Sequence, residues 1–188
     1  MATTHTPPRL ALGRATLDQV RTVLERELPQ QAASLLREIG FAAGDACFEG
    51  FVASVAERYG VETPQALDAR YLSEAVGGYL REEGWGAVAL ETLAPGLVAL
   101  DSPDWTEAGG RSAAVRSCHF SSGMLSDFCA RLGGYPAAVM EVECRSRGDA
   151  RCRFLTGSPD VLTWIYEGMV AGTAYTQLAD QLRAGARS

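Results

Sequence analysis

The most informative run of this sequence reads Glu141-Val-Glu-Cys144-Arg-Ser-Arg-Gly148-Asp-Ala-Arg-Cys152-Arg-Phe154. A Gly-Asp pair between two apolar runs is typical of a turn between strands, so we expect a hairpin formed by residues 138–144 and 151–156. Successive side chains of a strand point to opposite faces, which places Cys144 and Cys152 on one face and the neighbouring arginines on the other. The two thiols are therefore expected to lie on the same side of the sheet.

A third cysteine, Cys118, directly precedes a predicted helix over 119–132, and a helix N-terminus favours a thiolate. Three converging sulfurs would suit a structural zinc ion, which is four-coordinate and would fasten the hairpin to the start of this helix. The alternative interpretation is a set of buried thiols that pack as small hydrophobes, because the spacing is not a common zinc-finger pattern. Cys47 and Cys129 lie on apolar helix faces and are interpreted as packing residues.

The rest of the chain is predicted to be mostly helical. Apolar residues at helical spacing predict six helices. They are expected over 16–28, over 29–39, in a third segment that ends at Gly60, from Pro64 to Gly84, over 119–132, and from Pro159 through Leu182. Gly40 is expected to end the second helix as a left-handed cap. Ala94-Pro-Gly96 predicts another hairpin, with strands over 86–93 and 97–100.

These elements predict an α+β fold in which an antiparallel four-stranded sheet of two hairpins packs against a helical layer. Residues 1–15 are expected to form a flexible N-terminal tail, and residues 16–183 a single domain. A chain of 188 residues with 47% apolar and 21% charged residues fits one folded domain.

Composition also narrows the range of functions. The net charge of −6 argues against nucleic-acid binding, and no continuous apolar run is long enough to predict a membrane span. An odd number of cysteines and no recognisable export signal favour the cytoplasm. We identify no catalytic residues: Gly84-Trp-Gly86 opens a G-x-G-x-x-A pattern, but it follows a helix where a dinucleotide site requires a strand. A non-catalytic protein is favoured over an enzyme.

Several motifs resemble the 4-vinyl-reductase domain family over roughly residues 28–175. They are Cys118-His-Phe-Ser-Ser-Gly123, Gly84-Trp85-Gly86 and the run from Glu141 to Phe154. The family includes an accessory protein assigned to bacteriochlorophyll 4-vinyl reduction, hydrocarbon-binding proteins, and sensor domains of aromatic-responsive activators. The resemblance implies a fold like that of TRAPP vesicle-tethering subunits, and a homodimer.

The resemblance also implies a ligand set for the metal. In the phenol-sensor branch three cysteines and one glutamate hold zinc, and these match Cys118, Cys144, Cys152 and Glu141. On a regular strand Glu141 and Cys144 point to opposite faces, so both can bind one ion only if a bulge or bend intervenes. His119 or a water molecule are the alternatives for the fourth ligand.

The family places its aromatic ligand between the helices and the sheet, which favours Tyr71, Tyr79, Trp85 and Phe120 as pocket residues. Taken singly, aromatics at helical spacing are more often core residues. The arginines around Gly148 could bind a carboxylate or phosphate, but a solvated turn is the preferred interpretation.

The leading hypothesis is a small hydrophobic or aromatic ligand-binding domain, a sensor or carrier, with structural zinc. One alternative is an accessory protein of bacteriochlorophyll biosynthesis that binds a tetrapyrrole. Another is an assembly scaffold without a ligand. The sequence does not name the ligand.

Overall fold

The structure is a computed structural model that describes residues 12–109 and 112–185. The helices within these ranges are α1 (Arg14–Glu27), α2 (Ala32–Tyr59), α3 (Ala69–Glu82), α4 (His119–Gly133), α5 (Pro159–Val170) and α6 (Tyr175–Gly185). Short 3-10 helices occur at η1 (Pro64–Ala66), η2 (Thr106–Ala108) and η3 (Arg145–Arg147). The strands are β1 (Ala89–Ala94), β2 (Leu97–Ser102), β3 (Ala138–Glu143) and β4 (Cys152–Gly157).

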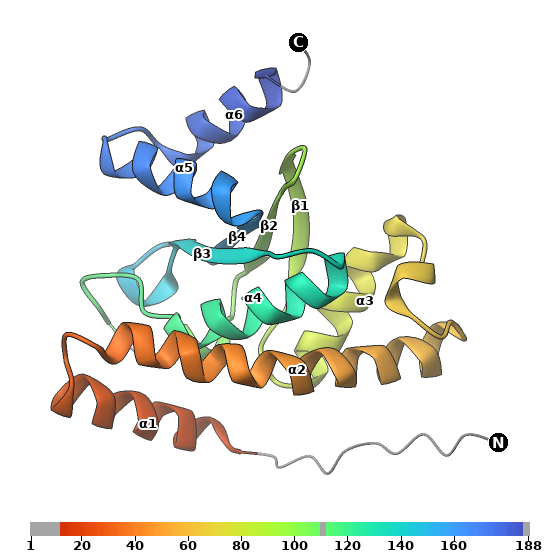
Figure 1. Cartoon of the computed structure of the whole chain (residues 1–188). Coiled ribbons are helices and arrows are strands. Elements are labelled where there is room, and N and C mark those ends of the chain that lie inside the picture. The colour runs from red at the N-terminus through yellow and green to blue at the C-terminus, as the bar shows by residue number, and fades with distance from the viewer. Residues whose placement is uncertain (1–11, 110–111, 186–188) are drawn as a thin grey trace.

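The sheet is antiparallel throughout, in the order β1-β2-β4-β3, so two hairpins join through β2 and β4. Figure 1 shows α4, α2 and α1 on one side of the sheet and α5 and α6 on the other. Phe154 belongs to the apolar core on the α4 side, whereas its neighbour Leu155 belongs to the core beneath α5 and α6. The predicted α+β class is confirmed, with helices covering both faces of the sheet.

Close contact between α2 and α4 depends on glycines. A Cβ atom on Gly40 would lie 2.0 Å from the Phe120 carbonyl oxygen, and one on Gly123 would lie 1.9 Å from the Arg37 carbonyl oxygen. The two backbones therefore touch where no side chain intervenes. The prediction that Gly40 ends a helix is wrong, because α2 continues through it to Tyr59. Pro29 lies in the turn between α1 and α2 and does not open a helix.

The C-terminal helix predicted to continue through Leu182 is divided. Gly172 adopts a φ of 94°, which ends α5 and returns the chain as α6. Ile165 of α5 and Leu178 of α6 then share one apolar core with Leu155 of the sheet. The helix expected to begin at Pro64 instead begins at Ala69, where the Asp68 side chain caps it.

The predicted N-terminal tail meets the described residues only at its end. Residues 1–11 lie outside the described part of the chain, and α1 begins at Arg14, inside the predicted tail. By length and composition alone, α2 is apolar enough to cross a membrane. Its glycine face, however, packs against α4, as expected for the central helix of a globular core.

Candidate metal centre and ligand pocket

Four buried side chains converge between α4 and the second hairpin. One ligand atom from each of Cys118, Glu141, Cys144 and Cys152 lies within 4.8 Å of all the others. The Cys118 sulfur is 3.8 Å from that of Cys144 and 4.0 Å from that of Cys152, far beyond disulfide length. Sulfurs bound at about 2.3 Å to one tetrahedral zinc ion are separated by about 3.8 Å. The three thiols therefore have the spacing of ligands to a single ion.

A β-bulge brings Glu141 to the cysteines. Glu141 pairs with Phe154, but Glu143 pairs with Arg153, so Val142 is an extra residue in β3. Val142 packs in the core beneath α5 and α6, and Glu143 accepts a hydrogen bond from Tyr175 of α6. The side chains of Val142 and Glu143 thus both face α5 and α6. The following residue, Cys144, therefore lies on the same face of the sheet as Glu141.

The Glu141 carboxylate is only half satisfied by the protein. Its Oε2 atom accepts a hydrogen bond from the Cys118 backbone N–H at 3.1 Å. Its Oε1 atom is buried and has no hydrogen-bond partner among the described residues. Burial raises the pKa of Glu141 to about 8, because an ionised carboxylate is costly in this environment. A cation between Oε1 and the sulfurs would offset that cost, so the donor set fits a metal ion.

The pKa shifts of the thiols also fit a site for a metal ion. Hydrogen bonds from Cys118 and Cys152 lower the pKa of Cys144, whereas hydrogen bonding to Cys144 and Cys152, with burial, raises the pKa of Cys118. Cys144 is therefore a thiol whose ionised form is stabilised by its neighbours. A divalent ion would allow all three sulfurs to ionise.

The turn of the second hairpin fixes the cluster. Gly148, with a φ of 99°, follows η3, and Asp149 accepts a hydrogen bond from the Cys144 N–H at 2.7 Å. The Ser146 hydroxyl lies 2.9 Å from the Cys144 sulfur and 2.8 Å from the Ser117 hydroxyl. These bonds tie the hairpin to the segment that precedes α4.

Three of the four arginines of this hairpin form ion pairs within the fold. Arg147 pairs with Asp149, and Arg151 pairs with Glu143 and Asp101. The Arg153 side chain is buried and pairs with Asp101 and Glu91. Arg153 therefore departs from the solvated turn that the sequence suggested.

His119, the alternative fourth ligand, is not a member of the cluster in the described part of the chain. It is half-buried and lines a separate cavity together with Arg37 and Arg116. Burial, reinforced by the nearby Arg37 charge, lowers the pKa of His119. Glu141 is the member of the cluster that accompanies the three cysteines.

The four predicted pocket aromatics occupy three different environments. Trp85 and Phe120 stack at a centroid distance of 5.9 Å and line a cavity of about 480 Å³. Tyr79 is only 3% exposed and packs against Phe51 in the core. Tyr71 is 42% exposed, with the Arg70 guanidinium over its ring. The structure thus brings two of the four together at a cavity.

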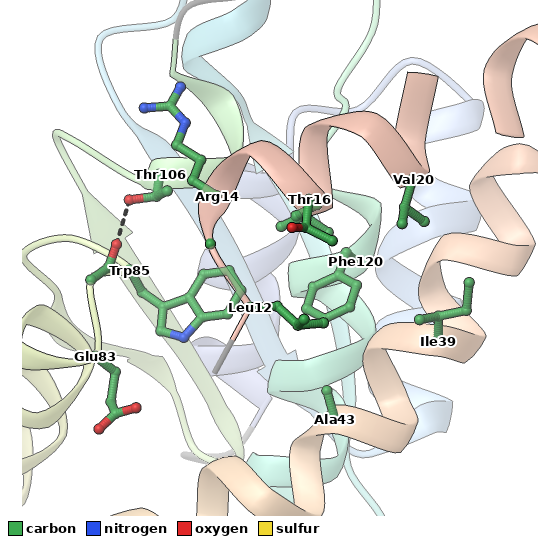
Figure 2. Close-up of a pocket in the computed structure, with 13 residues that line it drawn as sticks. Leu12, Arg14, Thr16, Val20, Ile39, Ala43, Glu83, Trp85, Thr106 and Phe120 are labelled. Atoms are coloured by element: carbon green, nitrogen blue, oxygen red, sulfur yellow. Dashed lines mark hydrogen bonds between the residues drawn. The ribbon is translucent and has the colours of Figure 1, made fainter. Parts of the chain in front are cut away.

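Helix α1 forms one wall of this cavity. Figure 2 shows Val20 of α1 near Ile39 of α2, and Leu12, which precedes α1, beside the Trp85 and Phe120 rings. The apolar stripe on the first helix was visible in the sequence. Its role as a cavity wall was missed, because apolar residues at helical spacing over 16–28 predict a helix but not what its apolar face contacts.

Glu107 is a buried residue that sequence reasoning did not identify. Its carboxylate accepts hydrogen bonds from the N–H groups of Phe120 at 3.1 Å and Ser121 at 2.8 Å, at the N-terminus of α4. Arg21 of α1 donates to its backbone oxygen at 3.0 Å. Burial raises the pKa of Glu107, although the Ser121 hydroxyl, these N–H donors and Arg21 oppose the shift. Glu107 thereby connects α1 to the turn that carries Cys118 and Phe120.

The fold and the site together define a class of protein. It is an α+β domain that has a buried group of three cysteines and one glutamate beside an apolar cavity. The family model of the 4-vinyl-reductase domain matches residues 108–158, which contain the whole cluster. The resemblance to the 4-vinyl-reductase family is therefore confirmed over this segment.

Solved structures share the fold. The phenol-responsive sensory domain of the transcription activator PoxR, with phenol, matches with a TM-score of 0.60 and 20% identity, over 80% of this chain and 76% of that one. A vinyl-4-reductase family protein from Methanocaldococcus jannaschii matches with a TM-score of 0.51 and 16% identity, over 79% and 82%. At these identities the likeness is one of fold.

A curated relative is the bacteriochlorophyll synthase 23 kDa chain of Cereibacter sphaeroides. It is 26% identical over 129 residues, which cover 67% of this chain and 61% of the relative. The chain therefore spans about three fifths of the length of that protein.

Proposed function

We propose that this protein is a ligand-binding domain that holds a small hydrophobic or aromatic molecule and acts as a sensor or carrier. The observation that carries the proposal is the cavity of about 480 Å³ beside Trp85 and Phe120. Its volume is within the usual range for ligand pockets, and most of its lining is apolar. The Trp85 and Phe120 rings in its lining supply apolar aromatic surface for contact with a guest. The PoxR sensory domain, which shares the fold, is described with phenol.

Thermal denaturation in graded concentrations of phenol, toluene and naphthalene tests this function. A ligand at ten times its Kd stabilises the folded state by about 1.4 kcal/mol, and the effect grows with concentration. Ala43 lines the cavity, so Ala43→Trp should fill it and abolish the stabilisation. Ala53→Trp places the same ring on an exposed position of α2 and should retain it. The proposal fails if no compound stabilises the wild type, or if both variants respond equally.

We further propose that Cys118, Glu141, Cys144 and Cys152 hold zinc in a structural site. Thiolate-rich four-coordinate sets suit zinc, and four protein ligands leave no open position for a substrate. When bound, the ion would supply charge neutralisation and a link between the hairpin and α4. We assign no catalytic residue.

Native mass spectrometry of protein purified without added metal or chelator tests the metal, the copurified ligand and the oligomeric state together. We expect a homodimer with one zinc per chain. A monomer at micromolar concentration would contradict the homodimer. A metal-free species would favour the interpretation that the cysteines are buried packing residues. Residence in the cytoplasm, without nucleic acid or a membrane span, is part of the same proposal.

A second candidate is an accessory role in bacteriochlorophyll biosynthesis with a bound tetrapyrrole, favoured by the similarity to the 23 kDa chain. A tetrapyrrole binder should copurify with a visible absorption band or shift the band of an added macrocycle. An assembly scaffold should show neither this band nor stabilisation by small apolar compounds.

A further inference from the structure

A second cavity, of about 720 Å³, lies on the other side of the start of α4. His119 lines this cavity, whereas the next residue, Phe120, lines the cavity beside Trp85. The two cavities have no lining residue in common. They are therefore separate sites with different chemistry.

Three guanidinium groups from three parts of the fold line the second cavity: Arg37 of α2, Arg116 of the segment before α4, and Arg147 of η3. Such a gathering of cations runs against the net charge of −6 of the chain. The acidic residue on the described lining is Glu141, whose carboxylate belongs to the thiol cluster. The cavity is therefore locally cationic.

The guanidinium groups differ in how far the fold already uses them. Arg147 pairs with Asp149 at 2.7 Å, and Arg116 makes one long hydrogen bond of 3.4 Å to the Val142 carbonyl oxygen. Arg37 is exposed and has no ion-pair or hydrogen-bond partner among the described residues. Within the described part of the chain, the donors of Arg37 and most of those of Arg116 are available to an anion.

The remaining lining of this cavity is largely apolar. Met140 of β3 forms part of its wall, and Val115 and Tyr166 contribute side chains that are 67% and 55% exposed. An apolar wall with guanidinium groups suits a molecule with an anionic head and an apolar body. Such a molecule would cover Val115 and Tyr166 while its head meets Arg37.

We propose that this second cavity binds an organic acid, with its carboxylate at Arg37 and Arg116 and its apolar body against Val115 and Tyr166. The site is spatially separate from the pocket beside Trp85. The competing explanation is that the arginines only balance the metal centre, since three thiolates and a carboxylate around a divalent ion carry about −2.

Isothermal titration of the purified protein with benzoate, 2-naphthoate and decanoate tests the proposal. The neutral 2-naphthylmethanol serves as the matched probe for 2-naphthoate. At least one acid should bind in the micromolar range, and 2-naphthoate should bind at least about tenfold more tightly than the alcohol. Added salt should weaken the binding of the acids.

Two pairs of variants locate the site. Arg37→Gln should weaken binding of the acid about tenfold, whereas Arg81→Gln, which removes an exposed arginine of α3, should not. Val115→Asp should also weaken it, whereas Val170→Asp, at a position 71% exposed on α5, should not. Ala43→Trp should leave the acid bound, which separates this site from the pocket beside Trp85.

The proposal is overturned if none of the acids binds below 1 mM (roughly −4 kcal/mol), if the alcohol binds as tightly as 2-naphthoate, or if Arg81→Gln matches Arg37→Gln. It is also overturned if Arg37→Gln changes only the metal content, because the arginines then serve the metal centre alone.

Discussion

Glu141 and Cys144 face the same side of the sheet although a regular strand would turn them to opposite sides. The extra residue in β3, Val142, produces this arrangement and is itself buried beneath α5 and α6. Strand β3 thus contributes side chains to both faces of the sheet. The bulge allows the Glu141 carboxylate to lie beside the three thiols.

Cys144→Ser should remove the bound metal and lower the free energy of unfolding by about 2 kcal/mol or more, or about 4–8 °C in Tm for a chain of this size. Cys129→Ser changes a thiol outside the cluster and should retain the metal. Metal analysis with thermal unfolding checks both. A chelator should lower the Tm of the wild type and of Cys129→Ser, but not of Cys144→Ser. Equal metal content in the two variants would contradict the metal centre.

Glu141→Gln should weaken metal binding at least about tenfold, because a neutral amide replaces a carboxylate ligand. Burial raises the pKa of this carboxyl, because an ionised carboxylate is costly there. The metal-free protein should therefore lose less stability from the glutamine than the metal-bound protein does. Competition with a chromophoric chelator measures the affinity, and unfolding of the metal-free proteins measures the stability. If the variant binds metal as tightly as the wild type, Glu141 is not a ligand.

Gly123→Ala should destabilise the fold by about 1–3 kcal/mol, because its Cβ would lie 1.9 Å from the Arg37 carbonyl oxygen and force α2 and α4 apart. Gly78→Ala in α3 is the matched control. Its Cβ would lie at an ordinary 3.6 Å from Arg58, so it should be neutral or stabilising by up to about 1 kcal/mol. Urea denaturation of both variants measures the difference. Similar stabilities would show that the helices can separate without cost.

Glu107→Gln should change how stability depends on pH. Burial raises the pKa of Glu107 above its ordinary 4.5, so the folded chain binds this proton more tightly than the unfolded chain. Its contribution is fully present below pH 4.5 and is lost as the pH rises through the folded-state pKa. The stability of the wild type relative to Glu107→Gln should therefore fall as the pH rises from 4.5. Chemical denaturation at several pH values measures this.

The control for that experiment is Glu62→Gln, which removes an exposed carboxylate and reports the effect of net charge alone. If Glu62→Gln and Glu107→Gln show the same pH dependence, burial of Glu107 is not the cause.

The hairpins and the convergence of the thiols were predictable because they follow from local rules. The turn at Gly148 and the alternation of side chains place Cys144 and Cys152 on one face. The sequence predicts the bulge only as a requirement for Glu141 and Cys144 to bind one ion. No residue in β3 indicates where the extra position lies. Its place is set by Val142 and Glu143 packing against α5 and α6, which are distant in sequence.

Predictions failed where tertiary contact overrides local preference. Gly40 has the signature of a helix end, but it lies within α2 because α4 crosses there at backbone contact. Tyr79 and Trp85 look alike in sequence, yet one is in the core and the other at a cavity. That difference depends on where α1 lies, and α1 is held in place by Arg21 and Glu107 across 86 residues of chain.

Cys118, His119 and Phe120 are consecutive, and each faces a different site: the thiol cluster, the cationic cavity and the aromatic cavity. If the proposed metal and guests bind there, one turn of backbone takes part in three binding equilibria. Any guest that rotates this turn changes the affinity of the other two sites, and thermodynamic reciprocity makes each effect equal in both directions. A metal ion bound by Cys118 would limit that rotation, so its removal should strengthen the coupling between the two cavities.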